Sequence, residues 1–114
     1  MHLMAYKDIF VKICVIGGAG FLGSRVVDAL EKAEVRTRVV DINRPHQNCD
    51  YWFGDVSSLD ESDSHWRDVD TIVNLAAEHR DDVRPRERYH QVNVDGARRV
   101  CEVARSAGVQ RIIF

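Results

Sequence analysis

The sequence has few cysteines, no long apolar run and no excess of positive charge, and each shortage disfavours a class of protein. Its three cysteines are an odd number at scattered positions, which fits reduced thiols better than a disulfide framework. No apolar stretch approaches the roughly 20 residues needed to cross a bilayer, and residues 1–8 lack the apolar core of a secretory signal. A net charge of −2 disfavours a general nucleic-acid binder, which is usually basic. We therefore expect a cytoplasmic protein without membrane or nucleic-acid partners.

What is present is an alternation of strand-like and helix-like periodicity along 114 residues, which is enough for one domain. Short loops between alternating elements predict a parallel, doubly wound α/β sheet with right-handed crossovers. We expect one domain over residues 1–114, with residues 1–10 as a flexible lead-in. The pattern predicts strands at 11–16, 35–41, 51–53, 70–75 and 111–114, and helices at 21–33, from 58, and at 86–107. The first helix should bury a face that includes Leu22, Val26, Leu30 and Ala33, and the spacing from Ser58 to Glu61 is that of a capping box. The last helix should bury one side and end at Gly108; that side comprises Val92, Gly96, Val100, Val103 and Ala107.

The most informative segment is the glycine-rich run at residues 17–23, between the first predicted strand and the first predicted helix. Gly17 permits a sharp turn out of the strand, Gly20 lets the backbone approach a diphosphate, and Gly23 lets the helix pack closely. The helix N-terminus would then face the phosphates. A purely structural turn is the alternative, but the strand–loop–helix context favours a Rossmann-type dinucleotide site.

Asp41 closes the second predicted strand, 18 residues after Gly23. This is near the spacing of about 20 residues at which an acid binds the adenosine ribose. A carboxylate accepts hydrogen bonds from the ribose hydroxyls and repels a 2′-phosphate, so Asp41 favours NAD over NADP. A solvated strand-end aspartate is the alternative. Arg44 could contact a 2′-phosphate or lie on the adenine, but we interpret it as pointing into solvent.

Together these motifs resemble the extended short-chain dehydrogenase/reductases, and more narrowly the NAD-dependent epimerase/dehydratase group that acts on nucleotide sugars. The resemblance runs from Val11 onward through residues 17–23, Asp41, and residues 54–56, 74–77 and 93–96. It implies that a set of residues forms the NAD site: Gly17, Gly20, Phe21 and Leu22 at the pyrophosphate, Gly23 in the same loop where the helix packs closely, Asp41 at the ribose, Asp55 and Val56 at the adenine, Leu75, Ala76 and Ala77 along the centre, and Asn93 on the long helix. A turn role for Asp55 and a local role for Asn93 remain open.

The chain departs from the resembled family in its catalytic residues. Members use a Tyr-x-x-x-Lys pair and a Ser or Thr, but Tyr6, Tyr51 and Tyr89 are followed four residues later by Phe10, Asp55 and Asn93. The resemblance places the catalytic and sugar-binding parts beyond Phe114. We therefore expect the N-terminal portion of a nucleotide-sugar epimerase or dehydratase, inactive alone and specific for the ADP half of NAD. A non-catalytic NAD(P)-binding sensor of the same fold is the alternative.

The missing portion should leave apolar surface bare, and the helix at 86–107 is expected to form a homodimer, as in the resembled family. We interpret the basic cluster before and in that helix as a solvated face rather than a site for a sugar-nucleotide phosphate. The five histidines share no ligand spacing, so no metal site is expected. Cys14, Trp52 and Trp66 are expected to be packing residues. The basic cluster comprises Arg80, Arg84, Arg86 and Arg88.

Overall fold

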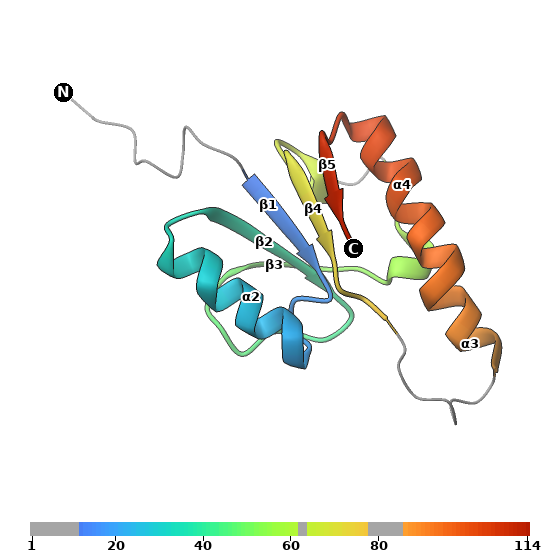
Figure 1. Cartoon of the computed structure of the whole chain (residues 1–114), viewed down its shortest axis with the longest axis horizontal. Coiled ribbons are helices and arrows are strands. Elements are labelled where there is room, and N and C mark those ends of the chain that lie inside the picture. The colour runs from blue at the N-terminus through green and yellow to red at the C-terminus, as the bar shows by residue number, and fades with distance from the viewer. Residues whose placement is uncertain (1–11, 62–63, 78–85) are drawn as a thin grey trace.

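A five-stranded parallel sheet forms the centre of the molecule, and the order of its strands across the sheet is β3-β2-β1-β4-β5 (Figure 1). The computed structural model describes residues 12–61, 64–77 and 86–114; the expected lead-in at 1–10 lies outside them. The predicted doubly wound topology is confirmed. The strands are β1 (Lys12–Ile16), β2 (Arg36–Asp41), β3 (Asp50–Phe53), β4 (Thr71–Asn74) and β5 (Arg111–Ile113).

The strand β1 lies at the middle of the sheet and pairs in parallel with β2 on one side and with β4 on the other. The chain first builds β2 and β3 on one side of β1 and then crosses to build β4 and β5 on the other. The order in the sheet therefore reverses between β1 and β4. In open parallel sheets, ligands bind outside the carboxyl ends of the strands at such a switch point. The glycine-rich run begins directly after β1, so the topology places it there.

One face of the sheet is covered by α2 (Phe21–Lys32). Val27 is fully buried against Val15 and Val39, and Val26 and Leu30 pack at the margin of this cluster. The sequence pattern predicted a stripe through Leu22, Val26, Leu30 and Ala33, but Leu22 and Ala33 are exposed. The helix is rotated because Gly23, which is buried, faces the glycine-rich turn.

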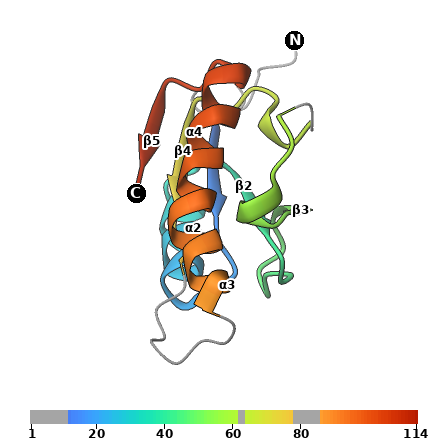
Figure 2. The ribbon, with the colours of Figure 1, turned by 90° about the vertical axis from the view of Figure 1, so that its right-hand side faces the viewer.

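The opposite face is covered by a helical stretch of three segments: α3 (Arg86–His90), the π-helical turn η3 (Gln91–Asp95) and α4 (Gly96–Ala107). Figures 1 and 2 show α2 and α4 on opposite sides of the sheet. Val92, Val100 and Val103 are buried in the larger core cluster with the strand residues Cys14, Ile16, Val40 and Ile72. The predicted helix over 86–107 is therefore present with its predicted apolar face, except that Ala107 is exposed. Gly108, with φ of 76°, ends it as predicted.

The short helix predicted from Ser58 is wrong. Asp55 accepts the Ser57 amide and initiates a 3₁₀ turn, η1 (Val56–Ser58), so Ser58 ends a turn instead of capping a helix. A second 3₁₀ turn, η2 (Ser64–Trp66), follows. Trp66 is buried, so its predicted packing role is confirmed.

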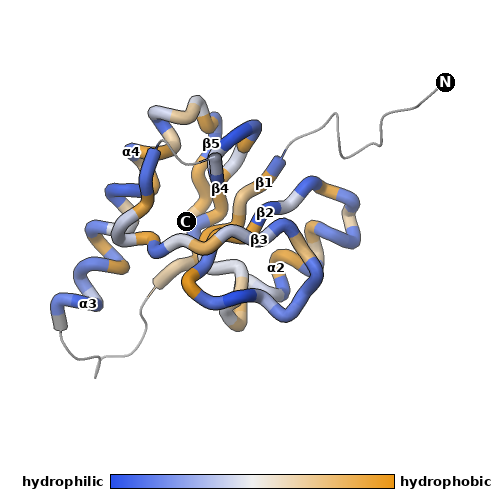
Figure 3. The backbone as a smooth tube through the Cα atoms, turned by 180° about the vertical axis from the view of Figure 1, so that it is seen from behind, coloured by the Kyte–Doolittle hydropathy of each residue, from blue (hydrophilic) through white to orange (hydrophobic). Residues whose placement is uncertain are grey.

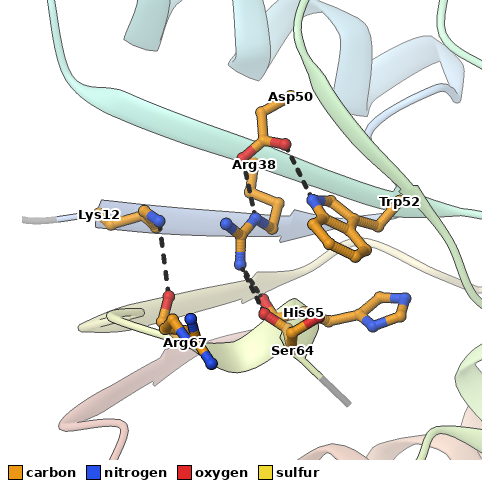
Figure 4. Close-up of polar contacts among 7 residues, drawn as sticks. All are labelled: Lys12, Arg38, Asp50, Trp52, Ser64, His65 and Arg67. Carbon is orange, nitrogen blue, oxygen red and sulfur yellow. Dashed lines mark hydrogen bonds and ion pairs between the residues drawn. The ribbon is translucent and has the colours of Figure 1, made fainter.

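A polar network lies over the amino half of the sheet, around the buried side chain of Arg38 (Figure 4). Its guanidinium lies 2.9 Å from Asp50 and donates to the backbone carbonyls of Ser64 at 3.1 Å and His65 at 2.5 Å. The Trp52 indole N–H donates to the other oxygen of Asp50 at 2.8 Å. These contacts tie β2 and β3 to η2, and we call them the Arg38 network.

Hydrophobic residues concentrate in the central strands, while α4 alternates between hydrophobic and hydrophilic positions (Figure 3). Large apolar side chains are nevertheless exposed at several places, including Tyr89 and Val94 on the long helical stretch and Ile113 and Phe114 at the edge strand. Among the described residues, no helix has the length and apolar character that a membrane span requires.

Candidate functional site

A cavity of about 220 Å³ opens at the carboxyl ends of the central strands, at the switch point between β1 and β4. It brings together predicted residues from four separate parts of the sequence. Seven predicted site residues line it: Gly17, Gly20, Asp41, Val56, Leu75, Ala76 and Ala77. Seven further residues complete the wall: Ile16, Val40, Ile42, Asn43, Gly54, Arg88 and Val92.

The glycine-rich turn is shaped by close backbone contacts. Gly17 has φ of 84°, and a Cβ there would lie 2.7 Å from the amide nitrogen of Ala76. A Cβ on Gly23 would lie 2.1 Å from the Gly17 carbonyl oxygen. The fold itself therefore requires glycine at these two positions, whatever binds in the cavity.

Gly20 differs from these two glycines because the fold does not require it. Its φ of −77° suits any residue, and a Cβ there would meet the protein only at 3.4 Å, an ordinary contact. Gly20 also caps α2 without any side-chain hydrogen bond within the described residues. The first amides of a helix lack intrahelical acceptors, so this end of α2 offers donors beside an uncluttered backbone.

Asp41 points toward the glycine-rich turn. One carboxylate oxygen accepts the Ala19 amide at 2.9 Å, and the other accepts the Asn43 amide at 2.9 Å. The carboxylate is therefore held at the cavity wall by the backbone on both sides. A carboxylate oxygen can accept more than one hydrogen bond, so each retains capacity for a ligand hydroxyl.

The segment after β4 forms the opposite wall. The buried side chain of Asn74 accepts the Ala76 amide at 3.2 Å, which fixes the turn through Leu75 and Ala76. The glycine-rich turn lies against the backbone of this segment, because a Cβ on Gly17 would lie 2.7 Å from the amide nitrogen of Ala76 and 2.9 Å from the carbonyl carbon of Leu75.

Arg88 lines the cavity and forms an ion pair with Asp55, which does not line it, with 3.4 Å between Arg88 Nη1 and Asp55 Oδ2. Partial burial acts to raise the pKa of Asp55, but hydrogen bonds from Ser57 and the Arg88 charge outweigh it and lower that pKa. The solvated-face interpretation is thus wrong for Arg88, because its side chain lines the cavity. Arg80 and Arg84 lie outside the described residues. Neighbouring arginines in sequence gave no signal that distinguished Arg88.

Five predicted site residues do not line the cavity: Gly23, which is buried behind the glycine-rich turn, Asp55, Phe21, Leu22 and Asn93. Phe21 and Leu22 are exposed at the start of α2, and Asn93 is half-buried on η3. Arg44 is exposed, as expected, but its guanidinium lies 5.6 Å from the centre of the Tyr51 ring. Within the described ranges, no three His, Cys, Asp or Glu side chains are grouped so that they could hold a metal ion.

Comparison with known proteins identifies one family. A profile of the NAD-dependent epimerase/dehydratase family matches residues 13–114, which is nearly the whole chain. A 4-epimerase of N-acetyl-α-D-glucosaminyl-diphospho-ditrans,octacis-undecaprenol from Escherichia coli O157:H7 is 37% identical over 103 residues. That alignment covers 90% of this chain and 31% of the relative.

Two further proteins show the range of the similarity. The decarboxylating sterol-4-α-carboxylate 3-dehydrogenase of Mus musculus is 31% identical, over 90% of this chain and 29% of its own. The solved structure of MoeE5 in complex with UDP-glucose and NAD superposes with a TM-score of 0.76 at 29% identity, over 89% of this chain and 34% of that one. The chain therefore spans about a third of the length of the relatives it matches.

Proposed function

The chain belongs to the NAD-dependent epimerase/dehydratase family, and we propose that its cavity holds the adenosine and pyrophosphate parts of NAD. The observation that carries this proposal is Gly20, a glycine that the fold does not require, at the uncapped start of α2. A diphosphate on this backbone would explain it, because a side chain there would separate the phosphates from the helix amides. Asp41 lies on the same cavity wall, where it would accept the ribose hydroxyls.

The other predicted residues fit the same ligand. Phe21 and Leu22 would contribute backbone amides to the pyrophosphate, and Gly23 would keep the helix close to the turn. Asp55 and Val56 would meet the adenine, while Leu75, Ala76 and Ala77 would lie along the centre of the cofactor. We propose a cofactor-side role for Asn93 on η3. When bound, NAD would accept or donate a hydride, and the residues described here would bind and orient the cofactor.

We propose that this part of the protein binds without moving protons, because no tyrosine in the chain is followed by lysine four residues later. For the whole protein we propose a sugar linked to a diphosphate as substrate, since the 37% identical relative is named as an epimerase of such a compound. The substrate proposal is tested separately from the binding proposal. Sugar nucleotides are incubated with the whole protein, and the products are separated by chromatography.

Calorimetric titration of the 114-residue chain with NAD, ADP and NADP tests the binding proposal. We expect ADP to bind nearly as tightly as NAD, because the cavity contacts are assigned to the ADP half. NADP should bind at least about tenfold more weakly, since its 2′-phosphate would approach the Asp41 carboxylate. Asp41→Asn should narrow the difference between NAD and NADP. NAD binding far more tightly than ADP, or no binding of either, would contradict the proposal.

A further inference from the structure

A second cavity, of about 280 Å³, opens at the opposite end of the sheet from the proposed NAD site, where β1, β2 and β3 begin. We call it the amino-end cavity. None of its wall residues lines the cavity at the carboxyl end, so a ligand here would not compete with NAD. The wall comprises Lys12, Glu31, Arg36, Thr37, Asn48, Cys49 and Asp50.

Lys12 is nearly buried, with 7% of its surface exposed, but its ammonium group is poorly satisfied. Among the described residues its one hydrogen bond is to the backbone carbonyl of Arg67, at a distance of 3.5 Å that is long for such a bond (Figure 4). An ammonium group has three N–H donors, and a buried charge is stable when it is paired and hydrogen-bonded. Lys12 therefore has donors available for a ligand in the amino-end cavity.

Arg36 adds a second positive charge on the same face of the sheet. It pairs with Lys12 in the register of β1 and β2, and paired residues of neighbouring strands project to the same face. In the part of the chain that the structure describes, the Arg36 guanidinium makes no hydrogen bond or ion pair. A ligand with negative charge between Lys12 and Arg36 would replace the repulsion of two cations by attraction to both.

The nearby carboxylates compensate this positive charge only in part. Burial, Arg38 and Arg36 lower the pKa of Lys12, in that order of effect, while the carboxylates of Asp50 and Asp68 raise it by less. Asp50 is already engaged in the Arg38 network. The remaining carboxylate of the wall, Glu31, belongs to α2, which covers the other face of the sheet.

We propose that the amino-end cavity binds a phosphate-type oxyanion, held by the Lys12 ammonium and the Arg36 guanidinium. A guanidinium can donate two parallel N–H bonds to a phosphate, and an ammonium adds a compact positive charge with further donors. The oxyanion is either free phosphate or the phosphate group of a small ester. This inference does not depend on the binding of NAD at the carboxyl end.

Calorimetric titration of the 114-residue chain with inorganic phosphate tests the proposal, with sodium chloride added to keep the ionic strength constant. The wild type should show saturable binding. Lys12→Met should weaken it at least about tenfold, and Arg36→Met at least about threefold, because each removes one charge that contacts the ligand. A parallel titration with glycerol 3-phosphate distinguishes the two sources, since binding of the ester as well would identify a phosphate group on a larger compound.

Lys32→Met is the matched control, because Lys32 is exposed in the last turn of α2 and does not line the amino-end cavity. It removes the same charge and should leave phosphate affinity unchanged. Urea unfolding checks that each variant is folded, and NAD affinity should be the same in Lys12→Met as in the wild type. The proposal would be overturned if the wild type did not bind phosphate, or if folded Lys12→Met and Arg36→Met variants bound it as the wild type does. Neither result would bear on NAD binding at the carboxyl end.

Discussion

Both ends of the sheet carry clustered polar groups, but the two clusters differ in how far their hydrogen-bonding capacity is used within the described residues. At the amino end, the Arg38 network pairs Arg38 with Asp50 and with two backbone carbonyls, and Arg38 itself is 7% exposed. At the carboxyl end, α2 begins without a side-chain cap, and within the described part of the chain the Asp41 carboxylate accepts from two backbone amides, which leaves it further acceptor capacity. Clustered polar residues therefore do not identify a site in this molecule; spare hydrogen-bonding capacity beside a cavity does.

The substitution of Arg38 tests this comparison with the largest expected effect, which is a loss of stability. In Arg38→Met, two carbonyls lose their donor and Asp50 loses its charge partner, so we expect the free energy of unfolding to fall by about 3 kcal/mol. Affinity for NAD should be unchanged, because no atom of the network lines the cavity. Urea unfolding followed by circular dichroism measures the free energy of unfolding, and calorimetric titration measures the affinity for NAD.

Arg111→Met provides the control for Arg38→Met. Arg111 pairs with Asp70 at 3.0 Å but is 64% exposed, so its removal should change the free energy of unfolding by less than about 1 kcal/mol. If the two variants were equally stable, the buried network would be no more important than a surface ion pair. If Arg38→Met remained folded but lost NAD affinity, the two ends of the sheet would not be independent.

The substitution Gly20→Ala has an expected effect of intermediate size and tests the cofactor site at the carboxyl end of the sheet. Gly20→Ala adds a methyl group that the fold accommodates, so the free energy of unfolding should change by less than about 0.5 kcal/mol. The same methyl group would occupy space assigned to the pyrophosphate. NAD affinity should therefore fall at least about tenfold.

Gly108→Ala is the matched glycine substitution for Gly20→Ala. Gly108 has φ of 76° and open space around it, so alanine should destabilise the fold by about 1 kcal/mol and leave NAD affinity unchanged. A Gly20→Ala variant that binds NAD normally would remove the main support for a phosphate at this helix end.

The fold and the strand-end residues could be predicted because they depend on local patterns. The glycine spacing, the strand before it and Asp41 are all set within about 30 residues, and the parallel topology brings them to one edge. The rotation of α2 was not predictable from periodicity, since it follows from the contact of Gly23 with the Gly17 carbonyl. Arg88 was misassigned because its partner, Asp55, lies 33 residues earlier and is reached only through packing.

The failed prediction at Ser58 has a similar cause. Two side chains, Asp55 and Ser58, could each have started the next element, and the spacing from Ser58 to Glu61 favoured the second. The structure uses Asp55, whose carboxylate takes both donors of Ser57. Gly96 then allows α4 to approach, since a Cβ there would lie 2.9 Å from the Val56 side chain. The Asp55 cap is thus made by a local contact, and the same turn carries Val56 to the close approach of α4 at Gly96.

The smallest expected effect is a pH dependence of stability, and it tests whether the core at the amino end of the sheet excludes water. Cys14 is fully buried and lies opposite Arg38 in the register of β1 and β2. Burial raises the pKa of its thiol to about 12, from an ordinary value of 9.0. The unfolded chain would therefore lose this proton above about pH 9 while the folded chain keeps it, so the thiol makes stability fall as pH rises from 9 to 12.

Comparison with Cys14→Ala isolates this contribution, because other groups titrate in both proteins. Between pH 8 and pH 10, the stability of the wild type relative to Cys14→Ala should fall by about 1.4 kcal/mol, measured by urea unfolding under reducing conditions. Cys101→Ala, at an exposed position, should show no such relative change. A wild type and a Cys14→Ala variant with parallel pH profiles would show that water reaches Cys14. The amino end would then be open to solvent, and its difference from the carboxyl end would reduce to the pairing of polar groups alone.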